Sequence, residues 1–360
     1  IFPSWTSALE LKPVDHRLLM AFSGFFATAF STEGSRVINL LENRAATCGL
    51  VSYYITLHEQ LGDAMPKETE HWFLLVFKHI WPHLRALMTA LAPIDKQAFN
   101  NDSLFLLHLL DRQLDLWVQE NPNTPTTEFF GDTTLEVLEY LVEIPHKLAL
   151  VPLVLPQLTL ASALTAPSLS EKEKQEIEFS WLALQVIASM TSAMGSGLKS
   201  SETALRVFRS TLTLLGQTQA LSSESLLSSP PVDRRQSSFG LFDSGYIGLK
   251  TLLVRVLANF AFGCKAVQEA AREFEAIPFI LNGCKDDSLN PYLREWSLFC
   301  CRNLCEGNEA NQQLIASMKM SGVIPSVELA QLGFKAIMED TGKIRLEKVE
   351  ATEDVEIVQK

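Results

Sequence analysis

Residues 248–284 read GLKTLLVRVLANFAFGCKAVQEAAREFEAIPFILNGC, and residues 293–330 read LREWSLFCCRNLCEGNEANQQLIASMKMSGVIPSVELA. The two segments are copies of one unit. An asparagine, a glycine and a glutamine recur 44 positions apart, so that Asn259, Gly263 and Gln268 match Asn303, Gly307 and Gln312. A self-similar period of about 40–47 residues is typical of helical repeat arrays. This repeat therefore decides the expected fold.

Each copy has the pattern of three successive helices. The first helix of the earlier copy has apolar residues at i, i+3, i+4 and i+7, which form one face; they are Leu253, Val256, Leu257 and Phe260. Gly263 and Gly307 follow this helix, where a left-handed residue ends it at the least steric cost. Pro278 and Pro325 suit the first turn of the last helix, where a missing N–H costs nothing. We expect an all-α, armadillo/HEAT-like right-handed helical solenoid.

A more specific order of residues runs through both copies. It consists of an Ile-Pro-Phe-Ile segment, a cysteine, an Asn-Pro turn, a Glu-Trp pair, Arg-Asn-Leu and Asn-Gln, at Ile277–Ile280, Cys284, Asn290–Pro291, Glu295–Trp296, Arg302–Leu304 and Asn311–Gln312. This order resembles the C-terminal domain of the ataxin-10 family, over about a quarter of the chain. Upstream of Gly248 the sequence has helical character without a motif.

The resemblance implies a non-enzymatic, cytoplasmic protein of eukaryotes, linked to cytokinesis, to cell survival signalling and, in animals, to neurite growth and cilia. Some fungal relatives carry a copper-transport label. The chain has no Met-x-x-Met or Cys-x-x-Cys pattern that would support copper chemistry. A copper role is therefore not expected here.

The composition divides the chain into four parts. Residues 222–245 are rich in serine and proline and are predicted to be a loop. They separate an N-terminal helical repeat region, residues 1–221, from the ataxin-10-like repeat pair, residues 246–338. Residues 339–360 are charged and poor in apolar side chains, which predicts a solvated tail.

The charge balance bears on the class of partner. A formal net charge of −12 over 360 residues argues against nucleic acid or an anionic membrane as the main partner, because phosphate binding needs clustered lysine and arginine. Other proteins, bound in a groove of the repeats, are the expected partners, and a homo-oligomer is compatible with the sequence. The expected location is the cytoplasm.

Five of the six cysteines lie within the repeat pair: Cys264, Cys284, Cys300, Cys301 and Cys305. Their neighbours are helical core residues, so we expect reduced, buried thiols. A zinc site is the alternative, but zinc ligands usually follow tight spacings such as C-x-x-C, which is absent. Core positions on the apolar face account for Cys300 and Cys301, and no metal site is predicted.

A membrane reading is possible only between Leu148 and Ser170, a stretch without charge. It contains Pro152, Pro156 and Pro167, which a lone spanning helix would carry poorly. A buried helix pair explains the stretch better. The alternative is a membrane-associated transport factor inserted through residues 148–170.

Catalysis requires converging groups, such as a nucleophile with a base, two carboxylates in a cleft or a phosphate cradle. The sequence contains no G-x-S-x-G, G-x-G-x-x-G, H-E-x-x-H or Walker pattern. We therefore expect neither catalytic residues nor a cofactor, and the sequence favours a non-enzymatic interaction scaffold.

Asn259 and Asn303 are the candidate partner-binding residues, because they lie on the helix type that lines an armadillo groove. An asparagine amide both donates and accepts, so it can hold the backbone of an extended peptide. The alternative is that each asparagine binds nearby carbonyls of its own protein, as most polar side chains do. Trp296 lies seven residues before Asn303 instead of one turn before it, which weakens the peptide-groove hypothesis.

Ser229 and Ser237 are the candidate phosphorylation sites in the predicted loop. Ser237 follows Arg234-Arg235-Gln236, as in substrates of basophilic kinases, and Ser229 lies in a Ser-Ser-Pro sequence of the order that polo-box domains favour. A phosphate would add about −1.5 to −2 charges and three strong acceptors to this segment. The alternative is that a serine-rich loop contains such triplets by chance.

Overall fold

The structure is a computed structural model that describes residues 24, 28, 34–61, 65, 67–91, 100–148, 150, 170–219, 248–285, 290, 292–318, 333–339 and 344–348. The chain forms two compact units, Ile1–Glu306 and Gly307–Lys360. The described residues are mostly helical, which confirms the predicted all-α class except for one short hairpin in the second unit.

The first unit begins with helices around an aromatic core: α2 (Gly34–Glu42), α3 (Arg44–Leu61), α4 (Lys67–Ile80), η3 (Trp81–His83) and α5 (Leu84–Leu91). The Tyr54 ring contacts the rings of Phe73 and Phe77, at centroid distances of 4.7 and 5.3 Å. Pro82 lies within the 3-10 turn that separates α4 from α5. The proline interrupts the helical run at this point, because its ring removes a helical hydrogen bond.

The middle of the first unit contains α6 (Asn101–Glu120), α7 (Thr127–Phe130), η4 (Gly131–Thr133), α8 (Thr134–Lys147) and α11 (Glu171–Ser192). Asn100 caps α6 by accepting from the backbone N of Ser103, and Ser170 forms a capping box with Glu173 at the start of α11. The short helix α7 follows a segment that is rich in proline, threonine and asparagine. Buried Phe129 and Phe130 hold this helical turn in place.

The last helices of the first unit are α12 (Ser196–Lys199), α13 (Glu202–Gln219), α14 (Leu249–Ala261), α15 (Lys265–Glu273), α16 (Ala276–Asn282) and α17 (Leu293–Cys305). The apolar face predicted for α14 is confirmed, since its four residues are 0% exposed. Gly263 has φ +63° and Gly307 φ +65°, as predicted for residues that end a helix. Pro278 lies in the first turn of α16, whereas Ile324-Pro325 lies outside the described residues.

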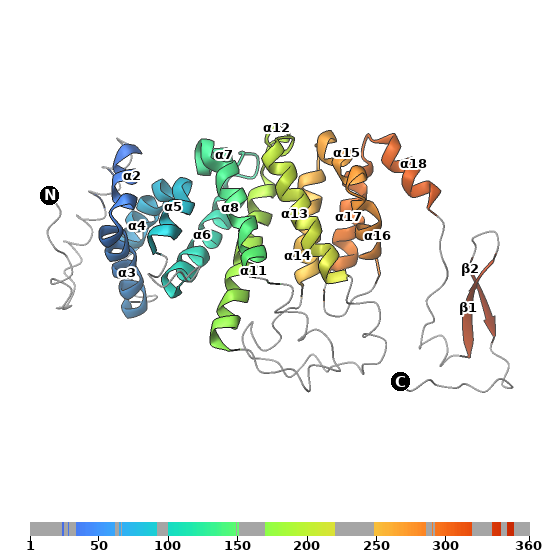
Figure 1. The fold of residues 1–360 in the computed structure, drawn as a ribbon, viewed down its shortest axis with the longest axis horizontal. Helices are drawn as coiled ribbons and strands as arrows, with labels where there is room; N and C mark the ends of the chain where they lie inside the picture. Colours follow the sequence, from blue (N-terminus) through green and yellow to red (C-terminus); the bar gives the residue numbers. More distant parts are fainter. Residues whose placement is uncertain are drawn as a thin grey trace. The chain divides into compact units, whose positions relative to one another are not determined.

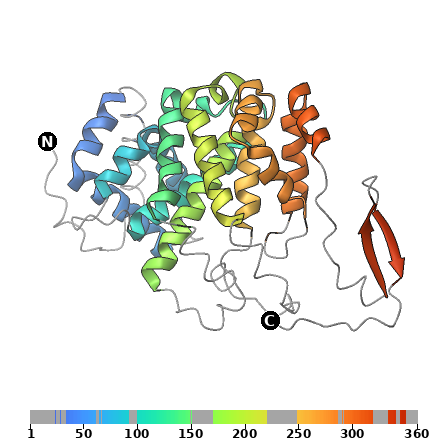
Figure 2. The same ribbon diagram turned by 45° about the vertical axis from the view of Figure 1, so that its right-hand side comes forward.

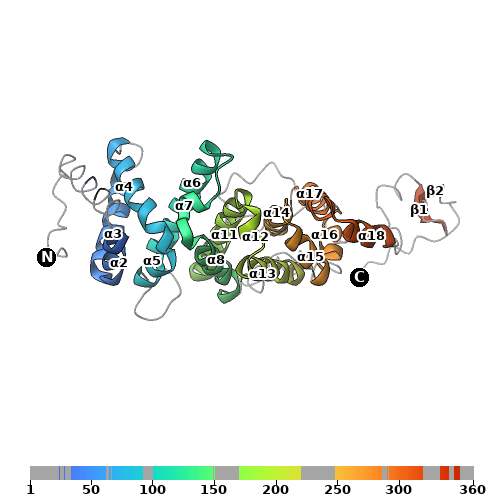
Figure 3. The same cartoon turned by 90° about the horizontal axis from the view of Figure 1, so that it is seen from above.

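The later helices of the first unit lie in two rows (Figures 1 and 3). In the first row, α6 packs on α11, α11 on α14 and α14 on α17. In the second row, α5 packs on α8, α8 on α13 and α13 on α16, and the rows contact each other through pairs such as α8 with α11. Figure 2 shows the green, yellow and orange helices of both rows side by side. Each helix thus buries its apolar face against its row neighbours and against the other row.

The second unit contains α18 (Glu309–Ser317) and a two-stranded antiparallel sheet, β1 (Phe334–Met338) paired with β2 (Ile344–Lys348). Phe334 lies opposite Lys348, and Met338 lies opposite Ile344. The strand β2 lies in the segment expected to be a solvated tail, and its Ile344 and Leu346 are 55% and 57% exposed. Alternation of apolar and charged residues over five positions is the strand signal that the high charge of this segment concealed.

Candidate protein-interaction surface

Asn259 and Asn303 occupy matching places near the ends of α14 and α17, and both direct their amide nitrogen at the preceding helix of the first row. Asn259 Nδ2 donates to the backbone O of Ala188 on α11 at 2.9 Å. Asn303 Nδ2 donates to the backbone O of Ala258 on α14 at 3.0 Å. The same bond therefore joins α14 to α11 and α17 to α14.

Two further side chains close the ends of these helices. Lys199 Nζ donates to the backbone O of Asn259 at 2.6 Å and of Phe262 at 3.3 Å. Gln268 Nε2 donates to the backbone O of Asn303 at 2.8 Å and of Glu306 at 3.2 Å. The last carbonyls of a helix have no partner within it, so both side chains supply donors that the helices themselves lack.

This pairing shows a further copy of the helical unit upstream of Gly248. Lys199 holds the fourth position of α12, and Gln268 holds the fourth position of α15. The order α11, α12, α13 therefore repeats the order α14, α15, α16. The sequence predicts a helical repeat region over residues 1–221 but does not give the bounds of this copy. A lysine caps the helix in one unit and a glutamine in the next, and the residues between α13 and α14 hide the spacing.

The hydrogen bonds limit what the two asparagines can offer a partner. Both amide nitrogens already have internal acceptors, as in the alternative that the sequence left open. Asn303 is 1% exposed, and its Oδ1 has no hydrogen-bond partner among the described residues. Asn259 is only half-buried. Contact of these residues with a partner stays a prediction, and Asn259 is the more accessible of the two.

Three half-buried residues of the first row form a charged and aromatic cluster, Asp111, Arg255 and Trp296, which we call the Arg255 cluster. The Arg255 guanidinium carbon lies 5.8 Å from the centre of the Trp296 ring. Burial is the main reason why the pKa of Asp111 is raised to about 6, and the charge of Asp115 adds to it. Arg255 and His108 act in the opposite direction and lower it. The cluster brings together one side chain each from α6, α14 and α17, and no sequence motif predicts it.

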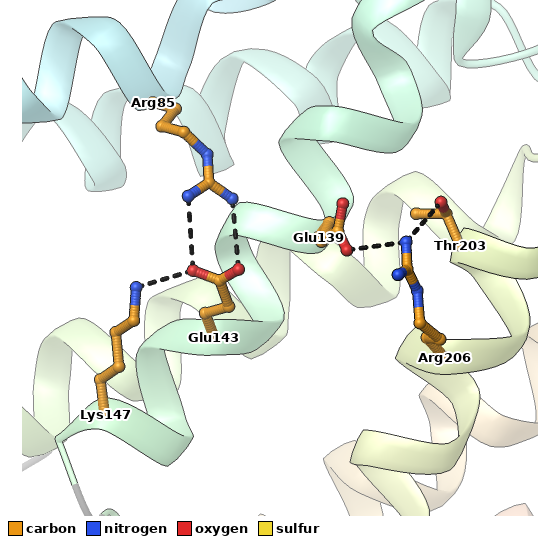
Figure 4. A network of polar contacts seen from close by, with 6 residues as sticks. All are labelled: Arg85, Glu139, Glu143, Lys147, Thr203 and Arg206. Atoms are coloured by element: carbon orange, nitrogen blue, oxygen red, sulfur yellow. Dashed lines mark hydrogen bonds and ion pairs between the residues drawn. The ribbon is translucent and has the colours of Figure 1, made fainter.

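The second row is joined by surface ion pairs (Figure 4). Glu143 on α8 forms an ion pair with Arg85 on α5, with 3.3 Å between Glu143 Oε1 and Arg85 Nη2. It forms a second ion pair with Lys147 on its own helix, with 2.7 Å between Glu143 Oε2 and Lys147 Nζ. Glu139 on α8 receives Arg206 from α13 at 2.9 Å. The hydrogen bond from Lys147 is the largest cause of the lowered pKa of Glu143. Exposed pairs of this kind contribute about 0–1 kcal/mol each, so they fix helix positions more than they stabilise the fold.

The cysteines are free thiols with different degrees of burial. Cys264 and Cys300 are buried, whereas Cys48, Cys284, Cys301 and Cys305 are half-buried. Cys300 is buried as predicted, whereas Cys301 is only partly buried and lies near Cys284. Burial raises the pKa of the Cys301 thiol to about 12. In the described part of the chain, no three His, Cys, Asp or Glu side chains gather in a group that could hold a metal ion.

Several predicted features lie outside the described residues. Ser229 and Ser237 belong to residues 220–247, and most of the uncharged stretch belongs to residues 151–169. Ser170, at the end of that stretch, caps α11. Across the ranges that the structure describes, none of the helices has the length and apolarity needed to cross a membrane.

The geometry defines a mostly helical protein in which one unit recurs and its polar side chains join neighbouring helices. Residues 249–347 match the family model described as the Spinocerebellar ataxia type 10 protein domain. This match confirms the resemblance of the C-terminal region to the ataxin-10 family.

Curated relatives agree with this assignment. The chain is 42% identical over 102 residues to the Ataxin-10 homolog of Dictyostelium discoideum, which covers 28% of this chain and 17% of that protein. It is 39% identical over 103 residues to Ataxin-10 of Xenopus tropicalis, covering 29% of this chain and 21% of that protein. It is 36% identical over 88 residues to Ataxin-10 of Homo sapiens, covering 24% and 18%. The chain thus matches about a fifth of the length of these relatives. No solved structure matches.

Proposed function

We propose that this chain is a non-enzymatic protein-interaction scaffold, similar to ataxin-10 and built as an armadillo-like solenoid. The observation that carries the proposal is the first row of helices, in which each asparagine amide binds the preceding helix. These bonds fix α11, α14 and α17 against one another, and Arg255 lies one turn before Asn259 on the same face of α14. A rigid row with a charged and aromatic side suits recognition of another protein, because less order has to be imposed on binding.

The Arg255 cluster is the proposed centre of this interaction. Tryptophan and arginine dominate the residues that carry most of the binding energy in protein interfaces. Arg255 and Trp296 are half-buried and already in contact, so a partner would meet a side-chain pair that is held in place. Asp111 supplies a negative charge in the same neighbourhood. The proposed partner is therefore a protein segment that offers both an apolar group and a charged group.

The test is affinity purification of the tagged full chain, with partners identified by mass spectrometry. The variant Arg255→Ala/Trp296→Ala should lose partners that the wild type retains. The matched control is Arg85→Ala, because Arg85 makes a similar contact with the Tyr140 ring at 5.1 Å in the second row. Equal losses from the variant and the control would refute the cluster as the binding site.

The cellular setting is part of the same proposal. The resemblance implies a cytoplasmic protein that acts in cytokinesis or in cell survival signalling. Depletion of the protein should then raise the fraction of multinucleate or dying cells. Re-expression of the wild-type chain should return this fraction to its normal value. If the Arg255→Ala/Trp296→Ala variant rescues the cells at equal abundance, the cellular role does not depend on the Arg255 cluster. The transport alternative has no support in the described residues.

The two serines remain a separate proposal about regulation. Phosphorylation at Ser229 or Ser237 would add a phosphate group to the segment between α13 and α14, and its oxygens could accept hydrogen bonds from a partner. Phosphopeptide maps of the cellular protein test it directly. Maps that stay unchanged in Ser229→Ala and Ser237→Ala would remove both sites from consideration.

A further inference from the structure

Four cysteines lie at the junction of α16 and α17. Cys284 follows α16 by two residues, and Cys300, Cys301 and Cys305 lie on α17. Cys300 is buried, whereas Cys284, Cys301 and Cys305 are half-buried. The junction thus holds a group of thiols for which the proposed scaffold role has no use.

The end of α16 approaches α17 closely at this junction. A Cβ at Gly283 would collide with Ser297 Oγ on α17. Cys284 is the residue after Gly283, and Cys301 lies one turn after Ser297 on the same side of α17. A disulfide requires such an approach, because its two Cα atoms lie only about 4.4–6.8 Å apart.

The thiols of Cys284 and Cys301 are in direct contact. The Cys301 thiol donates a hydrogen bond to the sulfur of Cys284. Cys284 Sγ in turn donates to the backbone O of Ile280 on α16 at 3.9 Å. The two sulfur atoms are therefore neighbours in the folded chain, and no helix has to move far for them to bond.

The other two cysteines on α17 do not fit a bond with Cys301 or reaction with a dissolved oxidant. Cys300 is 0% exposed, so an oxidant in water does not reach its sulfur. Cys305 lies four residues after Cys301, and Cβ atoms at this spacing in a helix are about 5–6 Å apart. A disulfide needs a Cβ separation of about 3.5–4.5 Å. Cys284 and Cys301 are the pair that combines contact with partial exposure.

The surroundings of the two thiols differ, which decides which of them reacts first. Burial raises the pKa of both thiols, and that of Cys301 reaches about 12. At Cys284 the hydrogen bond from Cys301 and the charge of Arg294 act in the opposite direction and lower the pKa. Because the thiolate is the nucleophile, Cys284 is the attacking sulfur, and its reaction is slower than that of a catalytic cysteine.

We propose that Cys284 and Cys301 are a redox-modification site, at which hydrogen peroxide forms a reversible disulfide that ties α16 to α17. The Cys284 thiolate attacks one peroxide oxygen and breaks the O–O bond, which leaves a sulfenic acid on Cys284 and releases hydroxide. This hydroxide takes up the proton that Cys284 had lost and becomes water. The Cys301 sulfur then attacks the Cys284 sulfur and displaces a second hydroxide, which leaves as water with the proton of Cys301.

The electrons balance in this sequence. The two thiols lose two electrons, and one peroxide molecule is reduced to two water molecules. A small thiol in solution reverses the bond by thiol–disulfide exchange. The site stands apart from the proposed scaffold role, because none of the Arg255 cluster residues takes part in it.

Mass spectrometry of the full chain tests the bond. After treatment with hydrogen peroxide and digestion without reductant, the wild type should yield a peptide pair linked through Cys284 and Cys301, which dithiothreitol separates. Cys284→Ser and Cys301→Ser should each abolish this pair. The matched control Cys305→Ser, at a half-buried cysteine one turn further along α17, should retain it. A wild type that forms no such link at a peroxide concentration that oxidises its methionines overturns the proposal.

The reagent dimedone, which labels sulfenic acids, tests the order of the two cysteines. In Cys301→Ser the sulfenic acid of Cys284 has no second thiol to displace its hydroxide, so dimedone should label Cys284. In Cys284→Ser, Cys301 should stay unlabelled. Label on Cys301 in that variant would overturn the assignment of Cys284 as the attacking sulfur.

Thermal unfolding tests whether the bond ties the two helices together. Oxidation should raise the unfolding midpoint of the wild type and of Cys305→Ser, because a disulfide restricts the unfolded chain. It should not raise the midpoint of Cys284→Ser or Cys301→Ser, and circular dichroism checks that all variants fold. An oxidised wild type with an unchanged midpoint would contradict the tie between α16 and α17.

Discussion

Gln268 donates from Nε2 to the backbone O of Asn303, 2.8 Å away, and thereby closes the helix whose own asparagine amide reaches back to Ala258. The two bonds run in opposite directions between adjacent helical units. One goes forward from the earlier copy to the end of α17, and the other goes back from α17 to α14. The unit recognised in the sequence is therefore incomplete in its hydrogen bonding without its neighbour.

Replacement of Asn303 should destabilise the fold more than replacement of Asn259. Asn303→Ala removes a buried hydrogen bond to Ala258, and such a loss costs about 1–3 kcal/mol. Asn259 is half-buried, and its acceptor on Ala188 also receives the hydroxyl of Thr191 at 3.1 Å. Urea unfolding of both alanine variants measures the difference. Equal losses of unfolding free energy would show that burial does not make the Asn303 bond more stabilising than the Asn259 bond.

The buried amine of Lys199 should be replaceable by an amide. Lys199→Gln keeps a donor for the carbonyls of Asn259 and Phe262, as Gln268 does in the next unit. Lys199→Met has a similar length but no donor, so we expect it to lose about 1–3 kcal/mol more stability than the glutamine variant. Thermal unfolding of the two variants makes the comparison. A methionine variant as stable as the glutamine variant would contradict the capping role.

A methyl group at Gly283 should be poorly tolerated. A Cβ at this position would collide with Ser297 Oγ and would lie 3.2 Å from the backbone O of Ile280. Overpacking of this kind costs about 1–3 kcal/mol. Ser297 Oγ is buried and has no hydrogen-bond partner among the described residues, so Ser297→Ala alone should change stability little.

The double variant provides the control for that collision. Gly283→Ala in the Ser297→Ala background should cost less than in the wild type, because the oxygen in the way is absent. Chemical unfolding of the four proteins in this cycle measures the coupling. If the two substitutions are additive, the contact with Ser297 is not the source of the strain.

Asp111 should make stability depend on pH between about 4 and 6. Its pKa is raised to about 6 in the folded chain from an ordinary value of 3.8, so the folded state holds a proton that the unfolded state has lost. The contribution is fully present below the ordinary pKa and is lost as the pH rises through about 6. Asp111→Asn should therefore flatten the fall in stability over this range and raise stability at pH 7. Urea midpoints at pH 4.5 and pH 7 test the sign, and an unchanged pH profile in the variant would refute it.

The sequence predicted the parts of the fold that follow local rules. Gly263 ends α14 because a left-handed residue is needed there, and Pro278 lies in the first turn of α16, where a missing N–H costs nothing. The turn α7 could not be foreseen because its cause is distant: Phe129 packs on Trp117, with ring centres 5.6 Å apart. The direction of Asn303 also depends on how α17 sits on α14, which no spacing within one helix determines. The Arg255 cluster was missed for the same reason, since it draws on three helices.

The bonds of Lys199 and Gln268 bear on where this chain can be cut or exchanged. A fragment that ends between α12 and α14 would retain a lysine directed at carbonyls that are no longer there. In a fragment that begins at Gly248, Asn259 would lack its hydrogen-bond acceptor on α11. A piece that can be transplanted as a whole must therefore include both bonded helices and the cap between them, for example α11, Lys199 and α14. Module boundaries for engineering this protein fall inside the sequence repeats, not between them.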